Sequence, residues 1–194
     1  MDAAKEAIDK AMMARCIELS RLAIAETEFP FGTVIALDGK VIAEAINRSV
    51  RDRDMTRHAE VIALSEVQRA IGREGLRRAT LYTNVEPCGM CAYCIREAWI
   101  GRVVYAIRSP IMGGHSKWNI LRDESISGMP QVFGPAPEVV TGVLLNEAQQ
   151  AWRDWNPLAW QMIKLRGVLT EPDTQERQIH RHPVLLQFLL HVHS

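Results

Sequence analysis

The chain has 194 residues, of which 47% are hydrophobic and 24% charged, and this composition is typical of a globular protein and argues against wholesale disorder. Its 23 Lys and Arg balance 23 Asp and Glu, so the composition argues against a protein built mainly to neutralise phosphate backbones. The longest apolar run, Pro183 to Leu190, is too short to span a bilayer, and the N-terminus lacks a signal-peptide core. We therefore expect a cytoplasmic protein of about one domain, with no membrane partner.

Hydrophobic periodicity and turn residues predict, in chain order, a helix over 2–26, strands over 33–37 and 41–46, helices over 58–70 and from 87 to about 99, and strands over 80–85, 102–107 and 138–143, followed by a helix over 144–166. The dipeptide Asp38-Gly39 favours a hairpin between the first two strands. Pro157 is expected to kink or divide the last helix. Residues 108–137 are rich in Gly, Pro and Ser and predict a long loop, which in a compact domain is usually functional or partly ordered. This order of elements indicates an α/β fold with one sheet covered by helices.

The chain is expected to divide into a domain over residues 1–166 and a C-terminal extension over 167–194. The extension ends in the apolar segment 183–190, which is too hydrophobic to lie free in water. We therefore expect the extension to dock on its own core or on a partner subunit.

Three of the four cysteines, Cys88, Cys91 and Cys94, lie close together in the sequence, which in a reducing compartment indicates metal binding or chemistry. Cys88 and Cys91 are three residues apart, so they share one face of the predicted helix, and a helix N-terminus favours thiolates. With His58, which opens the other helix, they supply two sulfurs and one imidazole. Three protein ligands leave the fourth zinc position for water, the pattern of a catalytic zinc.

Cys94 is not expected to join this site. It lies six residues beyond Cys88, roughly 9 Å along a helix axis. Sulfur ligands of one zinc must come within roughly 4 Å of each other. We expect Cys94 to be a small packed residue.

Glu60 follows His58 by two residues and can serve as a general acid and base beside a zinc-activated water. Either motif alone has low specificity, because redox dithiols and structural zinc sites share the C-x-x-C spacing. Together and in this order, His58-Ala-Glu60 and Pro87-Cys-Gly-Met-Cys91 match the zinc deaminase signature. A closed structural zinc site and a redox cysteine pair are the less favoured alternatives.

These residues resemble the cytidine deaminase superfamily, especially its guanine deaminase and tRNA-adenosine deaminase branches. The likeness covers roughly residues 5–160 and is carried by Pro30-Phe-Gly-Thr-Val-Ile35, Asn47-Arg48, Asp54-Met-Thr-Arg-His-Ala-Glu60, Leu81-Tyr-Thr83, Glu86-Pro-Cys-Gly-Met-Cys91, Ile100-Gly-Arg-Val-Val-Tyr105, Val140-Thr-Gly-Val-Leu-Leu145 and Gln150-Ala-Trp-Arg-Asp-Trp155. It implies a three-layer α/β/α sandwich with a five-stranded mixed sheet, usually dimeric or higher. The chain departs from both branches at Ala92-Tyr93-Cys94, where small residues are usual, and this alters the helix wall.

The resemblance also implies roles for individual residues. By the family pattern, His58, Cys88 and Cys91 bind one Zn²⁺, and Glu60 shuttles protons. The backbone N–H of Ala59 and the side chain of Asn47 would hold the substrate, because an amide offers both donors and an acceptor. A turn-forming Asn47 is the alternative. Phe31 is expected either to line the substrate pocket or to belong to the core.

The expected reaction is hydrolytic deamination of a nucleobase, nucleoside or related heterocycle, with release of ammonia. The favoured substrate is a small molecule, because the last predicted helix is aromatic but not densely basic, whereas RNA readers need basic grooves. The alternative is a tRNA wobble-adenosine deaminase, for which Arg51, Arg53 and Arg57 would touch phosphates. Trp118, in the long loop, is for either substrate class a candidate to cap a bound base. A solvated loop and a surface tryptophan are the plainer interpretations. An inactive binding protein is disfavoured because all four chemical residues are present.

Overall fold

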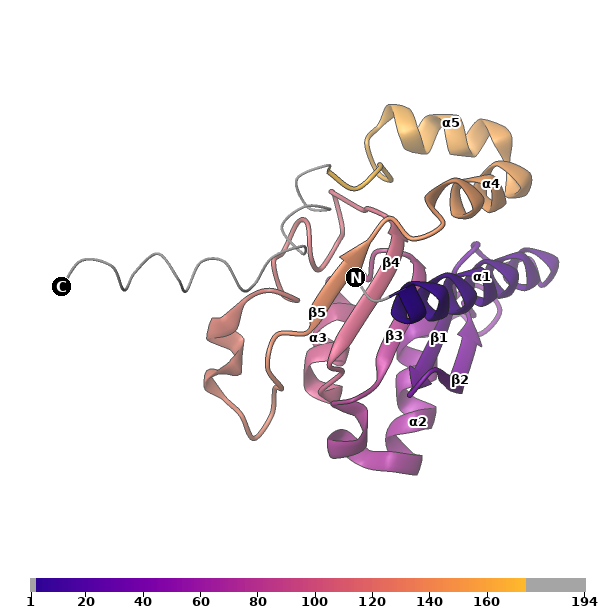
Figure 1. Cartoon of the computed structure of the whole chain (residues 1–194). Helices are drawn as coiled ribbons and strands as arrows, with labels where there is room; N and C mark the ends of the chain where they lie inside the picture. Colours follow the sequence, from indigo (N-terminus) through magenta and orange to yellow (C-terminus); the bar gives the residue numbers. More distant parts are fainter. Residues whose placement is uncertain (1–2, 174–194) are drawn as a thin grey trace.

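The computed structural model describes residues 3–173 (Figure 1). The helices and strands are α1 (Ala3–Ala25), β1 (Gly32–Leu37), β2 (Lys40–Ile46), α2 (Ala59–Leu76), β3 (Thr80–Val85), α3 (Gly89–Ala98), β4 (Arg102–Ile107), the short 3-10 helix η1 (Glu124–Gly128), β5 (Glu138–Thr141), α4 (Leu145–Trp155) and α5 (Pro157–Leu165). No described helix is both long and apolar enough to cross a membrane.

The five strands form one mixed sheet in the order β2-β1-β3-β4-β5. The β1 strand is antiparallel to both β2 and β3, whereas β3, β4 and β5 run parallel. The register pairs Gly32 with Ile46 and Thr33 with Thr83, so the start of β1 and the ends of β2 and β3 meet at one end of the sheet. The residues that follow β2 and β3 therefore emerge close together.

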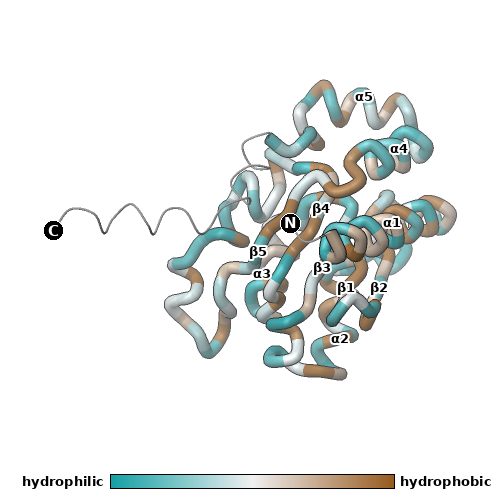
Figure 2. Tube along the Cα trace, viewed as in Figure 1, coloured by the Kyte–Doolittle hydropathy of each residue, from teal (hydrophilic) through white to brown (hydrophobic). Residues whose placement is uncertain are grey.

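Helices cover both faces of the sheet, which confirms the expected three-layer α/β/α architecture (Figure 1). The α2 and α3 helices pack on each other on one face, and α1 lies on the other face with α4 and α5. Each face has its own cluster of buried apolar side chains. Every residue of the interior strand β4, which lies between β3 and β5, is buried, and Figure 2 colours much of this strand as hydrophobic. Because helices cover both faces of the sheet, both sets of alternating side chains on such a strand are buried, and its sequence is apolar at nearly every position.

The predicted hairpin turn is confirmed, and the ends of two predicted elements shift for identifiable reasons. The hairpin turn is where Asp38-Gly39 predicts it, with φ of 49° and 75°. The α2 helix continues to Leu76 across a break at Gly72, whose φ of 65° is outside the helical range. The last strand ends at Thr141 because Gly142 turns the chain with φ of 79°.

The last predicted helix is divided in two at Pro157. Pro157 occupies the first turn of α5, where its missing N–H costs nothing. Asn156 caps this second helix by accepting a hydrogen bond from the backbone N–H of Ala159 at 2.9 Å. The sequence expectation of a kink or division here is therefore confirmed as a division.

A buried ion pair fastens α1 to the sheet. Asp9 accepts two hydrogen bonds from the Arg102 guanidinium, at 2.7 and 2.8 Å, and a third from the Tyr82 hydroxyl at 2.9 Å. Asp9 and Arg102 are both buried. Since Arg102 opens β4, this network lies at the end of the sheet opposite the residues that follow β3.

The described part of the expected C-terminal extension, residues 167–173, lies against the domain. Leu169 is buried in the cluster beneath α1, and Thr170 exchanges two backbone hydrogen bonds with Arg108, at 2.9 and 3.0 Å. Asp173 forms an ion pair with the Arg108 side chain at 2.8 Å. The apolar segment 183–190 lies outside the described residues.

Candidate zinc site

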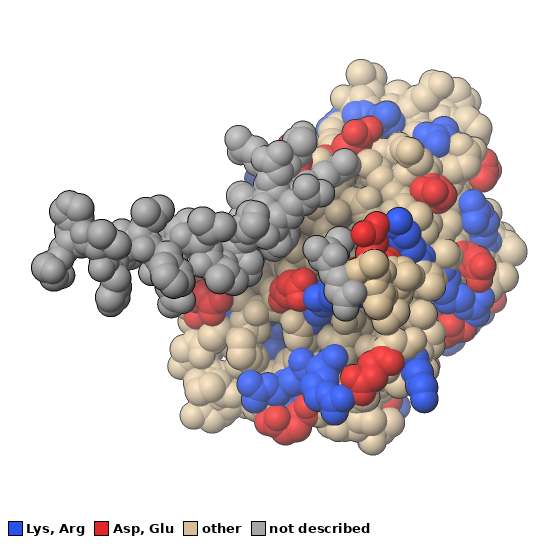
Figure 3. Space-filling view, in the orientation of Figure 1, with Lys and Arg blue, Asp and Glu red and all other residues tan. Residues whose placement is uncertain are grey.

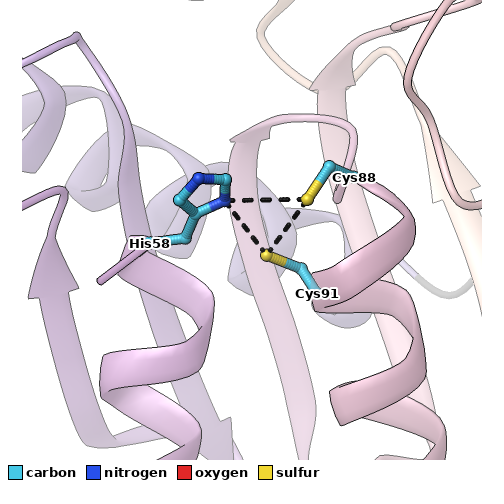
Figure 4. Close-up of side chains that lie close together, drawn as sticks. All are labelled: His58, Cys88 and Cys91. Carbon is cyan, nitrogen blue, oxygen red and sulfur yellow. Dashed lines mark hydrogen bonds between the residues drawn. The ribbon is translucent and has the colours of Figure 1, made fainter. Parts of the chain in front are cut away.

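Two helix N-termini meet at the end of the sheet where β3 finishes. His58 is the N-cap residue of α2, and Cys88, three residues after β3, is the N-cap residue of α3. Because the two helices pack on each other, both N-termini lie side by side (Figure 4). Cys91 is in the first turn of α3, so it faces the same point as Cys88.

The three side chains form a triangle of ligand atoms. His58 Nδ1 lies 3.6 Å from Cys88 Sγ and 3.4 Å from Cys91 Sγ, and the two sulfurs are 3.6 Å apart (Figure 4). In a tetrahedral zinc site with bonds near 2.3 Å to sulfur and 2.0–2.1 Å to nitrogen, these separations are roughly 3.6–3.8 Å. The donor set and its spacing therefore fit Zn²⁺, with room for one further ligand. Cys94 is not in this group; it is half-buried and packs against the core, as expected.

Burial and hydrogen bonding separate the pKa values of the two thiols. The hydrogen bond with Cys91, followed by that with His58, lowers the pKa of Cys88 to about 4. The same pairing with Cys88, together with burial, raises the pKa of Cys91. The hydrogen bond to Cys88 also raises the pKa of His58. One thiolate is thus available at neutral pH, which favours capture of a cation.

Glu60 lies in the first turn of α2 beside this triangle and is 6% exposed. Burial, and to a smaller extent the charge of Cys88, raise its pKa to about 7. A carboxyl group that exchanges its proton near neutral pH suits general acid and base catalysis. The arrangement can therefore hold a metal-activated water and move protons next to it.

The three expected substrate residues lie in different surroundings. Asn47 follows the end of β2 and is buried, with its amide nitrogen bonded to Glu28 Oε2 and Ser49 Oγ, both at 2.8 Å. Ala59 is buried as the first residue of α2, where backbone N–H groups are free of helix partners. Phe31 packs edge-on against Trp152, with ring centroids 5.3 Å apart, in the cluster on the α1 side of the sheet. This packing favours the core alternative for Phe31.

A buried carboxylate that the sequence did not single out joins a loop to the zinc helix. Glu86 accepts hydrogen bonds from the backbone N–H groups of Ser109, His115 and Ser116, at 2.7, 3.0 and 2.6 Å, and from the Ser116 hydroxyl at 2.8 Å. A Cβ atom on Gly113 would lie only 2.1 Å from the Glu86 carboxylate, so the loop needs glycine there. The sequence shows that Glu86 stands directly before Pro87, but it does not show which backbone N–H groups bind its carboxylate.

The same loop reaches the zinc ligands directly. Gly113 forms a β-bridge with Cys88, and the Gly89 N–H donates to the Met112 carbonyl at 3.1 Å. Farther along, Trp118 is 58% exposed and touches α3, since a Cβ atom on Gly89 would lie 3.3 Å from Trp118 Cδ1. The Lys117 ammonium lies 5.7 Å from the centre of the Trp118 ring. An exposed aromatic ring and a cation therefore adjoin the metal site.

Comparison with known proteins agrees with this geometry. Residues 6–107 match the family model of the cytidine and deoxycytidylate deaminase zinc-binding region. A tRNA-specific adenosine deaminase from Agrobacterium fabrum is 42% identical over 132 residues, covering 66% of this chain and 80% of that protein. A chloroplastic tRNA(adenine(34)) deaminase from Arabidopsis thaliana is 30% identical over 165 residues, or 80% of this chain, which spans only 13% of that longer protein.

Two solved structures share the fold. One, from a study of A-to-I editing by tRNA:A34 deaminases, has a TM-score of 0.60 and 33% identity, and the match covers 73% of this chain and 98% of that chain. The other, guanine deaminase from Nitrosomonas europaea, has a TM-score of 0.61 and 25% identity, over 76% and 84% of the two chains.

Sheet order, the triangle of ligands and the adjacent acid together define a zinc-dependent hydrolase that acts on C–N bonds. The chain belongs to the cytidine and deoxycytidylate deaminase family, whose zinc-binding region includes all three ligand positions.

Proposed function

We propose that this enzyme deaminates adenosine to inosine within a tRNA anticodon loop. The observation that carries the proposal is the similarity to proteins named tRNA-specific adenosine deaminases along most of their length, 80% for the relative from A. fabrum and 83% for one from Bacillus subtilis. A small free base was the substrate favoured by the sequence, because the last helix is not densely basic. The relatives support the RNA alternative more strongly.

The chain's own residues account for the proton transfers. When bound, zinc lowers the pKa of water to roughly 7 and so supplies the nucleophile for the ring carbon that bears the amine. Glu60 would take one proton of the attacking water and deliver it to the ring nitrogen. After the water oxygen has bonded to the ring carbon, Glu60 would carry the second proton, from the hydroxyl on that carbon, to the amine, whose bond to the carbon then breaks to release ammonia. The Ala59 N–H points from the start of α2 and is suited to hold an acceptor atom of the base.

RNA binding is supported by the surface next to the site. Trp118 offers a ring on which a flanking base can stack, and Lys117 beside it offers a cation for a phosphate. The loop over 47–57 carries further arginines, but several are already paired, Arg48 and Arg57 with Asp52 and Arg51 with Glu26. Figure 3, which shows the face that α1 covers, has basic and acidic side chains interspersed there as well. Because the arginines of the 47–57 loop are largely paired, we expect stacking to contribute more to affinity than phosphate contacts.

Guanine is the second candidate substrate. The guanine deaminase structure matches the fold as well as the tRNA enzyme does, with TM-scores of 0.61 and 0.60. A free purine would need no basic surface, which is consistent with the zero formal net charge.

The test is ammonia release by the zinc-loaded protein from an anticodon stem-loop with adenosine at the wobble position, and from free guanine, adenine, cytosine and adenosine. The proposal expects release from the stem-loop far above that from any free base, with inosine as the product. Glu60→Gln, which leaves the ligands intact, is the control for contaminating activity. Release from guanine but not from the stem-loop would establish the second candidate instead. Zinc content without ammonia from any substrate would indicate a binding protein.

We also propose that the enzyme is a homodimer. Tyr93, on α3, is 48% exposed and pairs with Phe133 at a centroid distance of 6.2 Å, which leaves an aromatic surface beside the zinc helix. Burial of such a surface favours association. Sedimentation equilibrium of the zinc-loaded protein should give twice the mass of 21.9 kDa, and Tyr93→Ser should shift the equilibrium toward the monomer.

A further inference from the structure

Glu28 lies in the turn after α1 and is 1% exposed, yet it takes no part in the metal site. Its Oε1 accepts the backbone N–H of Arg51 at 2.7 Å. Its Oε2 accepts the Asn47 side-chain amide at 2.8 Å and the backbone N–H of Val50 at 3.2 Å. A buried carboxylate can only accept, so it fixes both the loop after β2 and the orientation of the Asn47 carboxamide.

Both amide hydrogens of Asn47 are thereby engaged. One is donated to Glu28 and the other to Ser49 Oγ, at 2.8 Å each. Reversing the carboxamide would place its oxygen against the Glu28 carboxylate, which has no hydrogen to share. The group that Asn47 can still offer to a ligand is its carbonyl oxygen, which is an acceptor only.

Asn47 borders the metal site through the loop that it opens. The backbone N–H of Arg48 donates to the carbonyl of Arg57 at 3.0 Å, so the loop closes on itself directly before His58. Because β2 also ends at the edge of the sheet where β3 ends and the ligand triangle lies, we expect a substrate held between Glu60 and the triangle to meet the end of β2.

We propose that Glu28 is a positioning residue that makes Asn47 a pure acceptor, and that in an RNA substrate this acceptor receives the 2′-hydroxyl of the target nucleotide. The ring nitrogens of adenosine are acceptors, and its exocyclic amine is the leaving group that Glu60 must protonate. Within an RNA strand, the 2′-hydroxyl is the remaining donor of that nucleotide, and it distinguishes RNA from DNA. The second half of this inference rests on the proposed function.

The first measurement needs no substrate. In the ¹H–¹⁵N spectrum of the zinc-loaded protein, the Asn47 side-chain amide, identified by its loss in Asn47→Asp, should show two slowly exchanging protons. In Glu28→Gln, the introduced NH₂ group faces the NH₂ group of Asn47, so the hydrogen bond between the two side chains is lost. The Asn47 amide protons should then exchange rapidly. Glu26→Gln is the matched control, because Glu26 pairs with the Arg51 side chain on the surface. An Asn47 amide that is unchanged in Glu28→Gln would overturn the positioning role.

The second measurement compares stem-loops with adenosine or 2′-deoxyadenosine at the target position. We expect wild type and Glu26→Gln to prefer the ribonucleotide roughly 5- to 100-fold in kcat/KM, because the deoxynucleotide leaves the buried Asn47 carbonyl without a donor. Asn47→Ala should lose this preference. Glu28→Gln should weaken this preference. Glu28→Gln/Asn47→Asp should restore it, because the side-chain amide at position 28 then donates to the carboxylate at position 47, which again offers an acceptor to the 2′-hydroxyl. A preference that survives in Asn47→Ala would overturn the 2′-hydroxyl contact.

The two measurements separate this inference from the proposed function. If the wild type releases ammonia from guanine and not from the stem-loop, the proposed function and the 2′-hydroxyl contact both fail. The exchange rates of the Asn47 amide still decide whether Glu28 positions it.

Discussion

Replacing Glu86 by Gln should weaken the attachment of the 108–118 loop to the zinc helix. The carboxylate receives four donors, and Gln presents an NH₂ group to at least one of the N–H groups that now bind it. The least costly arrangement places this NH₂ against the Ser109 N–H, because the Ser116 hydroxyl can turn and accept. One charged hydrogen bond is then lost and one buried N–H is left unsatisfied, for a cost of about 2–4 kcal/mol.

Thermal unfolding of the zinc-loaded protein checks this value. For a chain of this size, about 2–4 kcal/mol corresponds to a fall in Tm of roughly 4–16 °C. Glu97→Gln is the matched control: Glu97 lies on α3, the helix that follows Glu86, in an exposed ion pair with Arg73, at 3.3 Å, so its loss should cost less than about 1 kcal/mol. A Glu86→Gln protein that melts within a degree of wild type would refute the anchoring role.

Four further changes test the site and the fold. Cys88→Ala should lose zinc by elemental analysis and lower Tm, because metal binding is coupled to folding; full zinc occupancy would contradict the ligand assignment. Glu60→Gln should retain zinc but lose turnover by several orders of magnitude in the ammonia assay, and an active variant would remove Glu60 from its role. Gly32→Ala places a Cβ atom 2.4 Å from a carbonyl of α1 and should cost about 1–3 kcal/mol in urea unfolding, so an unchanged midpoint would argue against this close packing. Asp9→Asn leaves the buried Arg102 charge with only the half-exposed Glu138 carboxylate, 3.3 Å away, and should cost about 3 kcal/mol in the same assay, the lower end of the range for a broken buried pair, whereas a loss below about 1 kcal/mol would mean that the pair is replaceable.

Local signals in the sequence were sufficient to locate most elements and the metal ligands. Pro157 located the division of the last helix because its ring restricts φ and removes the N–H, and Asp38-Gly39 located the hairpin because Asp and Gly tolerate the positive φ that the turn needs. The spacing of Cys88 and Cys91 on one helix turn required the two sulfurs to approach each other, and they lie 3.6 Å apart.

Contacts between side chains and distant backbone were not predictable in the same way. Glu28 binds Asn47 across 19 residues, and Glu86 binds the 108–118 loop through N–H groups that every sequence contains. Arg96, which is also buried, donates to the carbonyls of Ile120, Asp123 and Gly134 and so orders the long Gly- and Pro-rich segment. Composition indicated that this segment was partly ordered, but it carries no signal for which buried charge holds it.

The pairing of Asp9 with Arg102 has a consequence for biosynthesis. The two residues are 93 positions apart, and translation at about 5–20 residues per second separates their synthesis by roughly 5–20 seconds. Throughout that interval the first helix carries a carboxylate whose only salt-bridge partner in the native fold, among residues 3–173, has yet to be translated. The nascent helix therefore cannot complete its docking until the fourth strand has left the ribosome, which makes the assembly of the second layer a late event during translation.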